Sequence, residues 1–289
     1  MSVAHAEGGG YYLPSPSPYP VLLSTALLFL FAGAALGVND YTLAALWLAG
    51  IGGLLLIVVI SGWVGSVISE NRSGVYHKTE DGAFRWGMFW FITSEVVFFS
   101  TLFGVLFYER NISIPWLASF TQNFQHITPW AGFTAAWPTS GPAGSAFTPE
   151  HAWGIPALNT LILLTSGGTV TWGLGSIVKG HRGAATWLVA ATIILGAIFL
   201  GMQAREFYLA YTDLHLTLAS GVYGATFFIL TGFHGLHVTL GMIMLCVIFA
   251  RLLRGDFGPD NHFGFEAVSW YWHFVDVVWL MLFVFVYWL

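Results

Sequence analysis

The sequence carries little charge for its length. Only 8% of its 289 residues are Asp, Glu, Lys or Arg, whereas 56% are hydrophobic, and the mean hydropathy is +0.73. Soluble globular proteins carry about 25% charged residues. The composition therefore excludes a soluble globular protein and predicts an integral membrane protein.

Cysteine and basic residues are scarce as well. The single cysteine, Cys246, lies in an apolar run, which excludes an intrachain disulfide and a cysteine-based metal cluster. The net charge of −5 comes without a basic run, so we expect no nucleic acid among the partners. The sequence also lacks a phosphate-binding loop, a nucleophile elbow and a dinucleotide fingerprint. We therefore expect no catalytic residue in this chain.

The first 20 residues contain no Lys or Arg and have four prolines at alternate positions from Pro14 to Pro20. Proline disfavours helix, so we expect an irregular Pro-rich tail over residues 1–20. The absence of basic residues argues against a cleaved presequence. We expect this tail to remain in the mature protein.

Long apolar runs predict an all-α membrane protein with seven transmembrane helices. Seven of the nine Lys and Arg residues fall on the side of the N-terminus, which predicts a cytoplasmic N-terminus and an outer C-terminus. A polar cytoplasmic linker, 70–83, separates a two-helix unit (21–69) from a five-helix unit (84–289). The second unit includes a long outer loop, 109–154, without a helical or strand period. The predicted spans are 21–38, 41–69, 84–108, 155–178, 184–211, 218–250 and 264–288.

One acid, Glu95, lies inside the apolar run from Phe84 to Tyr108. This run rises about 37 Å as a helix and can cross a bilayer core of about 30 Å, which places Glu95 near mid-membrane. A carboxylate there costs about 2.5–3.5 kcal/mol, so we expect Glu95 to be protonated, paired or turned toward a polar interior. Its role could be a purely structural hydrogen bond. We favour a proton-exchanging or gating carboxyl.

The last two spans contain an intramembrane set of polar residues. His234 and His237 are three residues apart in one span, and His273 and Asp276 have the same spacing in the next. With Glu95 they could bind a metal, and the histidines could ligate a haem. The interpretation that we favour is hydrogen bonding between packed helices, with no metal or haem in this chain.

Three longer runs identify a family. RWGMFWFITSEVVFF (85–99), GVYGATFFILTGFHGLHVTLG (221–241) and HFGFEAVSWYWHFVDVVWL (262–280) resemble segments of subunit III of the haem–copper cytochrome c oxidases. The likeness covers nearly the whole chain. It implies a seven-helix subunit beside oxidase subunits I and II, which hold the haem and copper. It also implies that the two-helix and five-helix units form a V-shaped cleft that binds phospholipids.

The resemblance implies a function and residues that serve it. A subunit III is a non-catalytic accessory subunit that supports proton uptake, oxygen access and the stability of the catalytic subunit in aerobic respiration. The proton-linked intramembrane acid of the family falls on Glu95. The residues expected to bind lipid are Trp63, Glu70, His77, Arg85, Tyr223 and Arg251.

Several points stay open at the level of sequence. The loop 109–154 is longer than in familiar members, which suggests an extra partner on the outer face. Abundant Ala and Gly favour a bacterial plasma membrane over the mitochondrial inner membrane. The electron donor is undecided, so a quinol oxidase subunit III is an alternative. Two rivals of other classes are a stand-alone proton-coupled transporter that uses Glu95 and a haem-binding helical bundle.

Overall fold

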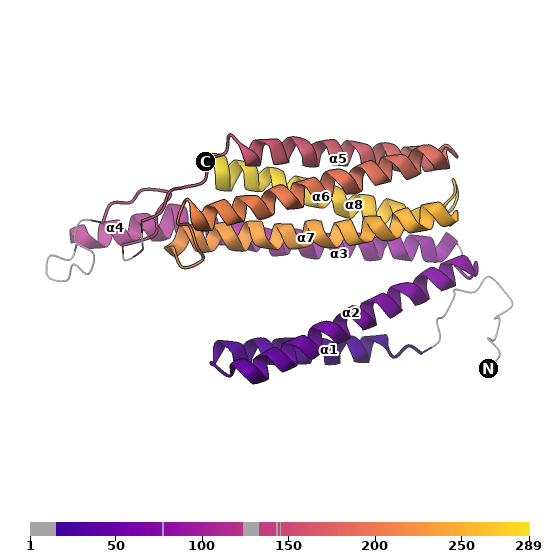
Figure 1. Cartoon of the computed structure of the whole chain (residues 1–289), viewed down its shortest axis with the longest axis horizontal. Helices are drawn as coiled ribbons and strands as arrows, with labels where there is room; N and C mark the ends of the chain where they lie inside the picture. Colours follow the sequence, from indigo (N-terminus) through magenta and orange to yellow (C-terminus); the bar gives the residue numbers. More distant parts are fainter. Residues whose placement is uncertain (1–15, 77, 124–132, 143, 145) are drawn as a thin grey trace. The chain divides into compact units, whose positions relative to one another are not determined.

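Helices are the only regular secondary structure in the part of the chain that the structure describes. The computed structural model describes residues 16–76, 78–123, 133–142, 144 and 146–289 (Figure 1). Within these ranges helices alternate with turns and irregular segments, and no strand occurs. Seven of the helices so described are long and apolar enough to cross a membrane, which confirms the predicted fold class. They are α1 (Tyr19–Val38), α2 (Thr42–Arg72), α3 (Lys78–Tyr108), α5 (Ile155–Val178), α6 (Arg182–Thr212), α7 (Gly221–Arg254) and α8 (Phe263–Leu282).

Local backbone preferences explain where helices begin and end. Pro20 lies in the first turn of α1, where the fixed φ of proline suits a helix start. Gly255 ends α7 with a φ of 87°, a left-handed conformation that glycine adopts without a steric penalty. The N–H of Gly255 bonds to the carbonyl oxygens of Arg251 and Leu252. This cap fixes the direction in which the chain leaves α7 toward α8.

The helix that carries Glu95 continues beyond its expected end. Instead of an irregular loop from residue 109, α3 passes through a π-helical turn, η1 (Glu109–Ser113), into α4 (Ile114–Asn123). The expectation of a loop was therefore wrong for residues 109–123. α4 has 10 residues, fewer than the window over which a helical period can be recognised. The π-helical turn also precedes Pro115, where an ordinary helix would lose a backbone hydrogen bond.

The chain forms two compact units, Met1–Trp86 and Gly87–Leu289. In the first unit, α1 and α2 pack against each other with almost no space between their backbones. A Cβ added to Gly33 would lie 2.5 Å from the backbone nitrogen of Ala49, and one added to Gly52 would lie 2.5 Å from that of Leu30. Small residues permit this close approach of membrane helices.

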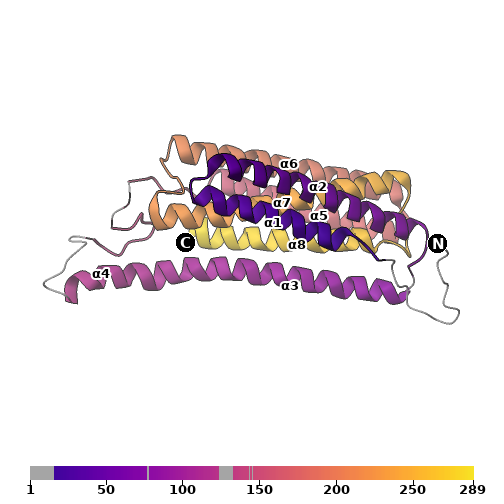
Figure 2. The ribbon, with the colours of Figure 1, turned by 90° about the horizontal axis from the view of Figure 1, so that it is seen from below.

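In the second unit, α5, α6, α7 and α8 form an antiparallel bundle. α5 packs on α6, α6 on α7 and α7 on α8, and α8 also packs on α5 (Figures 1 and 2). α3 joins this bundle through its aromatic side chains. The ring centroids of Phe98 and Phe233 on α7 are 5.1 Å apart, and those of Phe99 and Phe274 on α8 are 5.9 Å apart. These contacts hold the middle of α3 against α7 and α8.

Two tryptophans of α8 connect that helix to α5. Trp272 and Trp279 are both 0% exposed. Their indole N–H groups donate to Ser166 Oγ and Thr160 Oγ1, each over 2.9 Å. A buried indole needs such an acceptor. The hydroxyls therefore fix both the depth and the rotation of α8 in the bundle.

Gly241 of α7 lies against Trp272, and we expect Gly241→Ala to destabilise the bundle. The new Cβ would lie 2.9 Å from Cε3 and 3.0 Å from Cζ3 of the enclosed indole. Overpacking of this kind costs about 1–3 kcal/mol. Gly232→Ala on the same helix is the matched control, because a Cβ there meets nothing within 4 Å. Thermal unfolding should show a lower Tm for Gly241→Ala alone, and equal Tm values for the two variants would contradict this packing.

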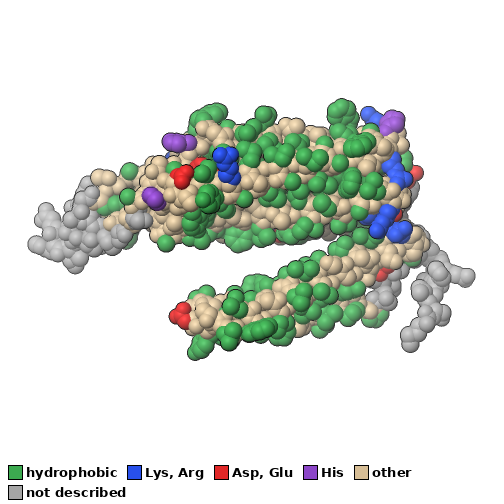
Figure 3. Space-filling view, in the orientation of Figure 1, with side chains coloured by type: hydrophobic (Ala, Val, Ile, Leu, Met, Phe, Trp, Pro, Cys, Tyr) green, Lys and Arg blue, Asp and Glu red, His purple; other side chains and the backbone are tan. Residues whose placement is uncertain are grey.

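The outer surfaces of the helices are apolar. Trp47 of α2 and Trp187 of α6 are 66% and 79% exposed. Figure 3 shows apolar side chains along the helices, with most of the visible Lys and Arg near one end of the α5–α8 bundle. Monomeric soluble proteins rarely expose apolar patches above a few hundred Å². The surface is that of a multi-pass membrane protein.

Candidate functional site

Glu95 is paired with a histidine of a neighbouring helix. Its Oε2 lies 2.9 Å from Nε2 of His237 on α7. The Glu95 side chain is 21% exposed and that of His237 10%. A mid-membrane acid can be protonated, paired or turned toward a polar interior, and in this structure Glu95 is paired.

The second ring nitrogen of His237 determines what the pair can hold. Nδ1 lies 2.6 Å from the carbonyl oxygen of Phe233. A carbonyl oxygen only accepts hydrogen bonds, so this contact assigns a proton to Nδ1. If the ring is neutral, Nε2 is an acceptor and Glu95 must be the protonated donor. If Nε2 also carries a proton, the ring is a cation and Glu95 is a carboxylate.

In both states one proton lies between Oε2 of Glu95 and Nε2 of His237, and the pair has no net charge. Neutrality lowers the cost of placing these groups inside a membrane. Imidazole is the side chain whose ordinary titration range includes physiological pH. The pair is thus chemically suited to exchange a proton between its two groups without a change in its net charge.

Aromatic rings surround His237. Phe98 of α3 stacks on the imidazole with centroids 6.0 Å apart, and Phe99 meets it at 4.9 Å with an interplanar angle of 67°. Tyr271 and Phe274 of α8 lie 6.5 and 6.4 Å away. These rings leave the His237 side chain 10% exposed.

A second acid–histidine pair lies on α8, next to α5. His273 Nδ1 is 3.2 Å from Oδ2 of Asp276, and its Nε2 is 2.8 Å from Oγ1 of Thr171. Thr171 donates its hydroxyl proton to the carbonyl oxygen of Gly167, so it accepts from Nε2. The same reasoning then places one proton between Nδ1 and Oδ2. A Cβ on Gly167 would lie 2.3 Å from Oδ2 of Asp276, so glycine is what admits the carboxyl here.

His234 has a different environment. It is 0% exposed, and its Nε2 is 3.3 Å from the carbonyl oxygen of Val275. Its ring lies against Phe199 and Trp279, with centroids 5.7 and 5.1 Å away. The predicted polar residues thus enter two acid–histidine pairs and one histidine–backbone contact.

The arrangement does not resemble a metal site. Within the described ranges, no group of three or more His, Cys, Asp or Glu side chains is placed to hold a metal ion. Each of the three histidines already contacts an oxygen atom of its own. The metal-binding interpretation of Glu95 and these histidines has no geometric support among those residues.

Three of the expected lipid-binding residues belong to the first unit. The ring of Trp63 is parallel to that of Tyr19, 6.1 Å away. The hydroxyl of Tyr76 donates to Oε2 of Glu70 over 2.5 Å. Arg85 donates from Nε to Asp81 Oδ2 over 3.0 Å. His77, the fourth such residue in this part of the chain, lies outside the described residues.

The other two, Tyr223 and Arg251, lie at opposite ends of α7. The helix rise of 1.5 Å per residue separates them by about 42 Å, so they cannot contact the same head group. Tyr223 is 4% exposed, with its ring stacked on Phe147 at 5.2 Å. Arg251 is 9% exposed, with Nε 3.4 Å from Oδ2 of Asp256. Both side chains are engaged within the protein, and their lipid contacts remain a prediction.

An acidic cluster near Tyr223 was not predicted. Glu206 of α6 is 0% exposed and lies near Glu150 and the Tyr287 hydroxyl. Tyr223 is close to both acids. The sequence did contain a signal for Glu206, because it is the one acid in the apolar span 184–211. Glu95 is likewise the one acid in the span 84–108. The partner Glu150 could not be recognised, since it comes from the irregular segment before α5.

Glu150 should make stability depend on pH. Burial raises the pKa of Glu150 above its ordinary value of 4.5, and the nearby His151 offsets part of this rise. The folded state therefore binds this proton more tightly than the unfolded chain, so stability falls as pH rises from about 4.5 through the raised pKa. We expect Glu150→Gln to raise the Tm above this window and to leave it unchanged below. Identical pH profiles of Tm for the two proteins would contradict this.

Comparisons with known proteins agree with the sequence resemblance. The family model described as Cytochrome c oxidase subunit III matches residues 9–289. Proteins named Cytochrome c oxidase subunit 3 from Formosania lacustris and Danio rerio are each 39% identical to this chain over 287 residues. The one from Cyprinus carpio is 38% identical over the same length. Each of these alignments covers 99% of both chains.

Proposed function

Because this chain belongs to the cytochrome c oxidase subunit III family, we propose that it is the non-catalytic accessory subunit of a haem–copper cytochrome c oxidase. Membership implies a complex with the other oxidase subunits. In this proposal subunits I and II hold the haem and copper, and this chain binds neither. It supports proton uptake, oxygen access and the stability of the catalytic subunit.

The observation that carries the proton-linked role is the contact between Glu95 and His237. A protonated acid or an ion pair can occupy this contact, and both states are neutral. The pair can therefore pass its proton from Glu95 to His237 with no change in net charge. It avoids a net charge in the membrane during exchange with a partner when it takes up one proton as it releases the other. A purely structural hydrogen bond would not need a titratable group on both sides.

Phospholipids complete the proposal as further partners. We assign their contacts to residues that match the lipid-binding positions of the family: Trp63, Glu70, His77, Arg85, Tyr223 and Arg251. The outer segment 109–154 is assigned to an additional protein partner on the outer face, because it is long and rich in Pro and Gly.

The proposed location is a bacterial plasma membrane with the N-terminus in the cytoplasm. Seven basic residues at the inner connections and helix ends against two at the outer ones support this orientation. Reporter fusions after Val178 and after Thr212 should report opposite sides of the membrane, with the Val178 junction inside. The reverse assignment would contradict the orientation and leave the family assignment untouched.

Purification through a tag on this chain, in mild detergent, tests the accessory role. We expect the intact preparation to contain haem together with subunits I and II, and the colour to remain with those partners when this chain is dissociated. Haem retained by the isolated chain would instead establish a haem-binding bundle. A colourless chain that purifies alone would support a stand-alone transporter.

A further inference from the structure

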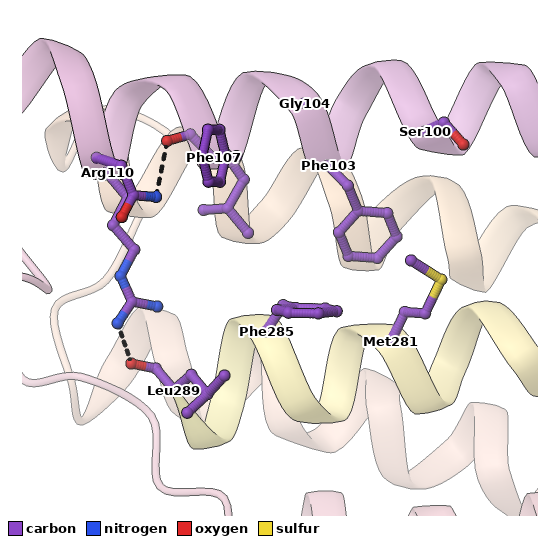
Figure 4. A pocket seen from close by; sticks show the side chains of 10 residues that line it. Ser100, Phe103, Gly104, Phe107, Arg110, Met281, Phe285 and Leu289 are labelled. Carbon is purple, nitrogen blue, oxygen red and sulfur yellow. Dashed lines mark hydrogen bonds between the residues drawn. The ribbon is translucent and has the colours of Figure 1, made fainter.

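A groove lies between α3 and α8 within the second unit. Its volume is about 570 Å³, inside the range of about 300–1,000 Å³ typical of small-molecule sites. Figure 4 shows Phe103, Phe107, Phe285 and Met281 between the two helices, with Arg110 and Leu289 at one end. The walls are mostly apolar, and Arg110 has the one charged side chain of the lining.

The groove has the length of one bilayer leaflet. On the α3 side it runs from Ser100 to Asn111, about 16 Å at 1.5 Å per residue. Half of a hydrocarbon core is about 15 Å thick. Gly104 lies in the middle of this wall, where a Cβ would meet nothing within 4 Å. An elongated apolar chain can therefore lie along the groove without displacing protein atoms.

With Glu95 near mid-membrane, as its apolar span predicts, Arg110 lies at the depth of lipid head groups. It follows Glu95 by about 22 Å along the helix, and the polar surface of a bilayer lies about 20–22 Å from its middle. Its Nη2 donates to the main-chain oxygen of Leu289 over 2.7 Å. Its guanidinium carbon lies 6.0 Å from the centroid of the Trp137 ring. A guanidinium has five N–H donors, so the bond to Leu289 leaves donors for a phosphate.

We propose that this groove binds one phospholipid of the leaflet at the Arg110 end, with an acyl chain between α3 and α8 and its phosphate on Arg110. A phosphate complements the guanidinium, whereas an apolar helix of a partner subunit would bring it no anion. The acyl chain restores the dispersion contacts that the facing rings would otherwise lack. This site uses none of the residues to which lipid contacts are assigned above. Its test measures bound phospholipid rather than respiratory activity.

The lipid content of the intact oxidase complex tests the site. Gly104→Leu fills the groove and should remove one tightly bound phospholipid per complex, measured by native mass spectrometry after a fixed detergent wash. Gly201→Leu on α6 is the matched control, since a Cβ there also meets nothing within 4 Å, and should keep the full number. Arg110→Gln should weaken retention about tenfold or more, as expected for a lost charge-assisted bond. Full retention in Gly104→Leu would overturn the proposal.

A photocrosslinking amino acid at Phe285 tests the occupant without filling the groove. Irradiation of native membranes, before any detergent is added, should give an adduct of this chain with the mass of a phospholipid. A cross-link to a protein subunit instead would show that a partner covers the groove and would overturn the proposal. This crosslinking experiment remains decisive if the Gly104→Leu variant fails to assemble into the oxidase complex.

Discussion

Glu95→Ala should destabilise this chain within its complex, whereas Glu95→Gln should leave stability nearly unchanged. The alanine leaves Nε2 of His237 without its partner at 2.9 Å. The loss is about 1–3 kcal/mol if the proton belongs to Glu95, which leaves an unsatisfied acceptor. It is about 3–5 kcal/mol if the proton belongs to His237, which leaves an unpaired buried charge. Thermal unfolding of the two variants measures the difference.

The glutamine variant separates structure from proton exchange. Its amide can donate to Nε2 of a neutral His237, so the contact between α3 and α7 persists. The amide cannot give up a proton, so we expect proton uptake by the oxidase to slow and inactivation during turnover to quicken. His237→Ala should reduce both stability and proton uptake. Unchanged proton uptake in Glu95→Gln would show that the pair is only structural.

Infrared difference spectroscopy identifies the resting state of the pair. We expect the shared proton to lie on Glu95 at rest, as the position of this acid in an apolar span predicts. The C=O band of a protonated carboxyl should then be present in the parent oxidase and absent from Glu95→Gln. An ionised Glu95 at neutral pH in the intact complex would contradict this expectation.

Arg251→Ala should be the second strongly destabilising change, by about 3–5 kcal/mol. Arg251 and Asp256 are 11% and 6% exposed at the side chain, and their atoms Nε and Oδ2 are 3.4 Å apart. The guanidinium carbon also lies 4.4 Å from the centroid of the Phe257 ring. Removing the arginine leaves the Asp256 carboxylate buried without this cation. The measurement is the Tm of the purified complex.

Arg254→Ala is the matched control for Arg251. It removes an exposed arginine from the same last turn of α7, so we expect a change within about 0.5 kcal/mol. The phospholipid content of the two variants addresses the lipid role expected from the family. A loss of bound phospholipid in Arg251→Ala without any change in Tm would show that this arginine acts through lipid rather than through Asp256.

The transmembrane part of the fold could be predicted because its signals are local. A run such as 155–178 is long and apolar enough to span a membrane, and α5 has the same bounds. Glu95 could be singled out for the same reason, since an acid in such a run is conspicuous. α4 escaped prediction because its 10 residues are too few to establish a period.

The partners inside the membrane could not be predicted, because they depend on which helix faces meet. His237 was recognised as a polar residue near the middle of its span. Its pairing with Glu95 requires α3 to lie against α7, and that contact is made by aromatic side chains far apart in the sequence. Glu150 and Glu206 are likewise 56 positions apart, and only the folded chain brings them together.

The most direct test of the accessory role compares the oxidase with and without this chain during sustained turnover. We predict that oxygen reduction begins at a similar initial rate in both, since the proposed function assigns the haem and copper to the partners. Without the chain, activity should then decay within fewer turnovers, fewer protons should be pumped per electron, and adding the chain back should restore both. Loss of haem and of all activity from the first turnover would place a redox centre in this chain and contradict the account. Equal lifetimes and equal proton yields would contradict it as well.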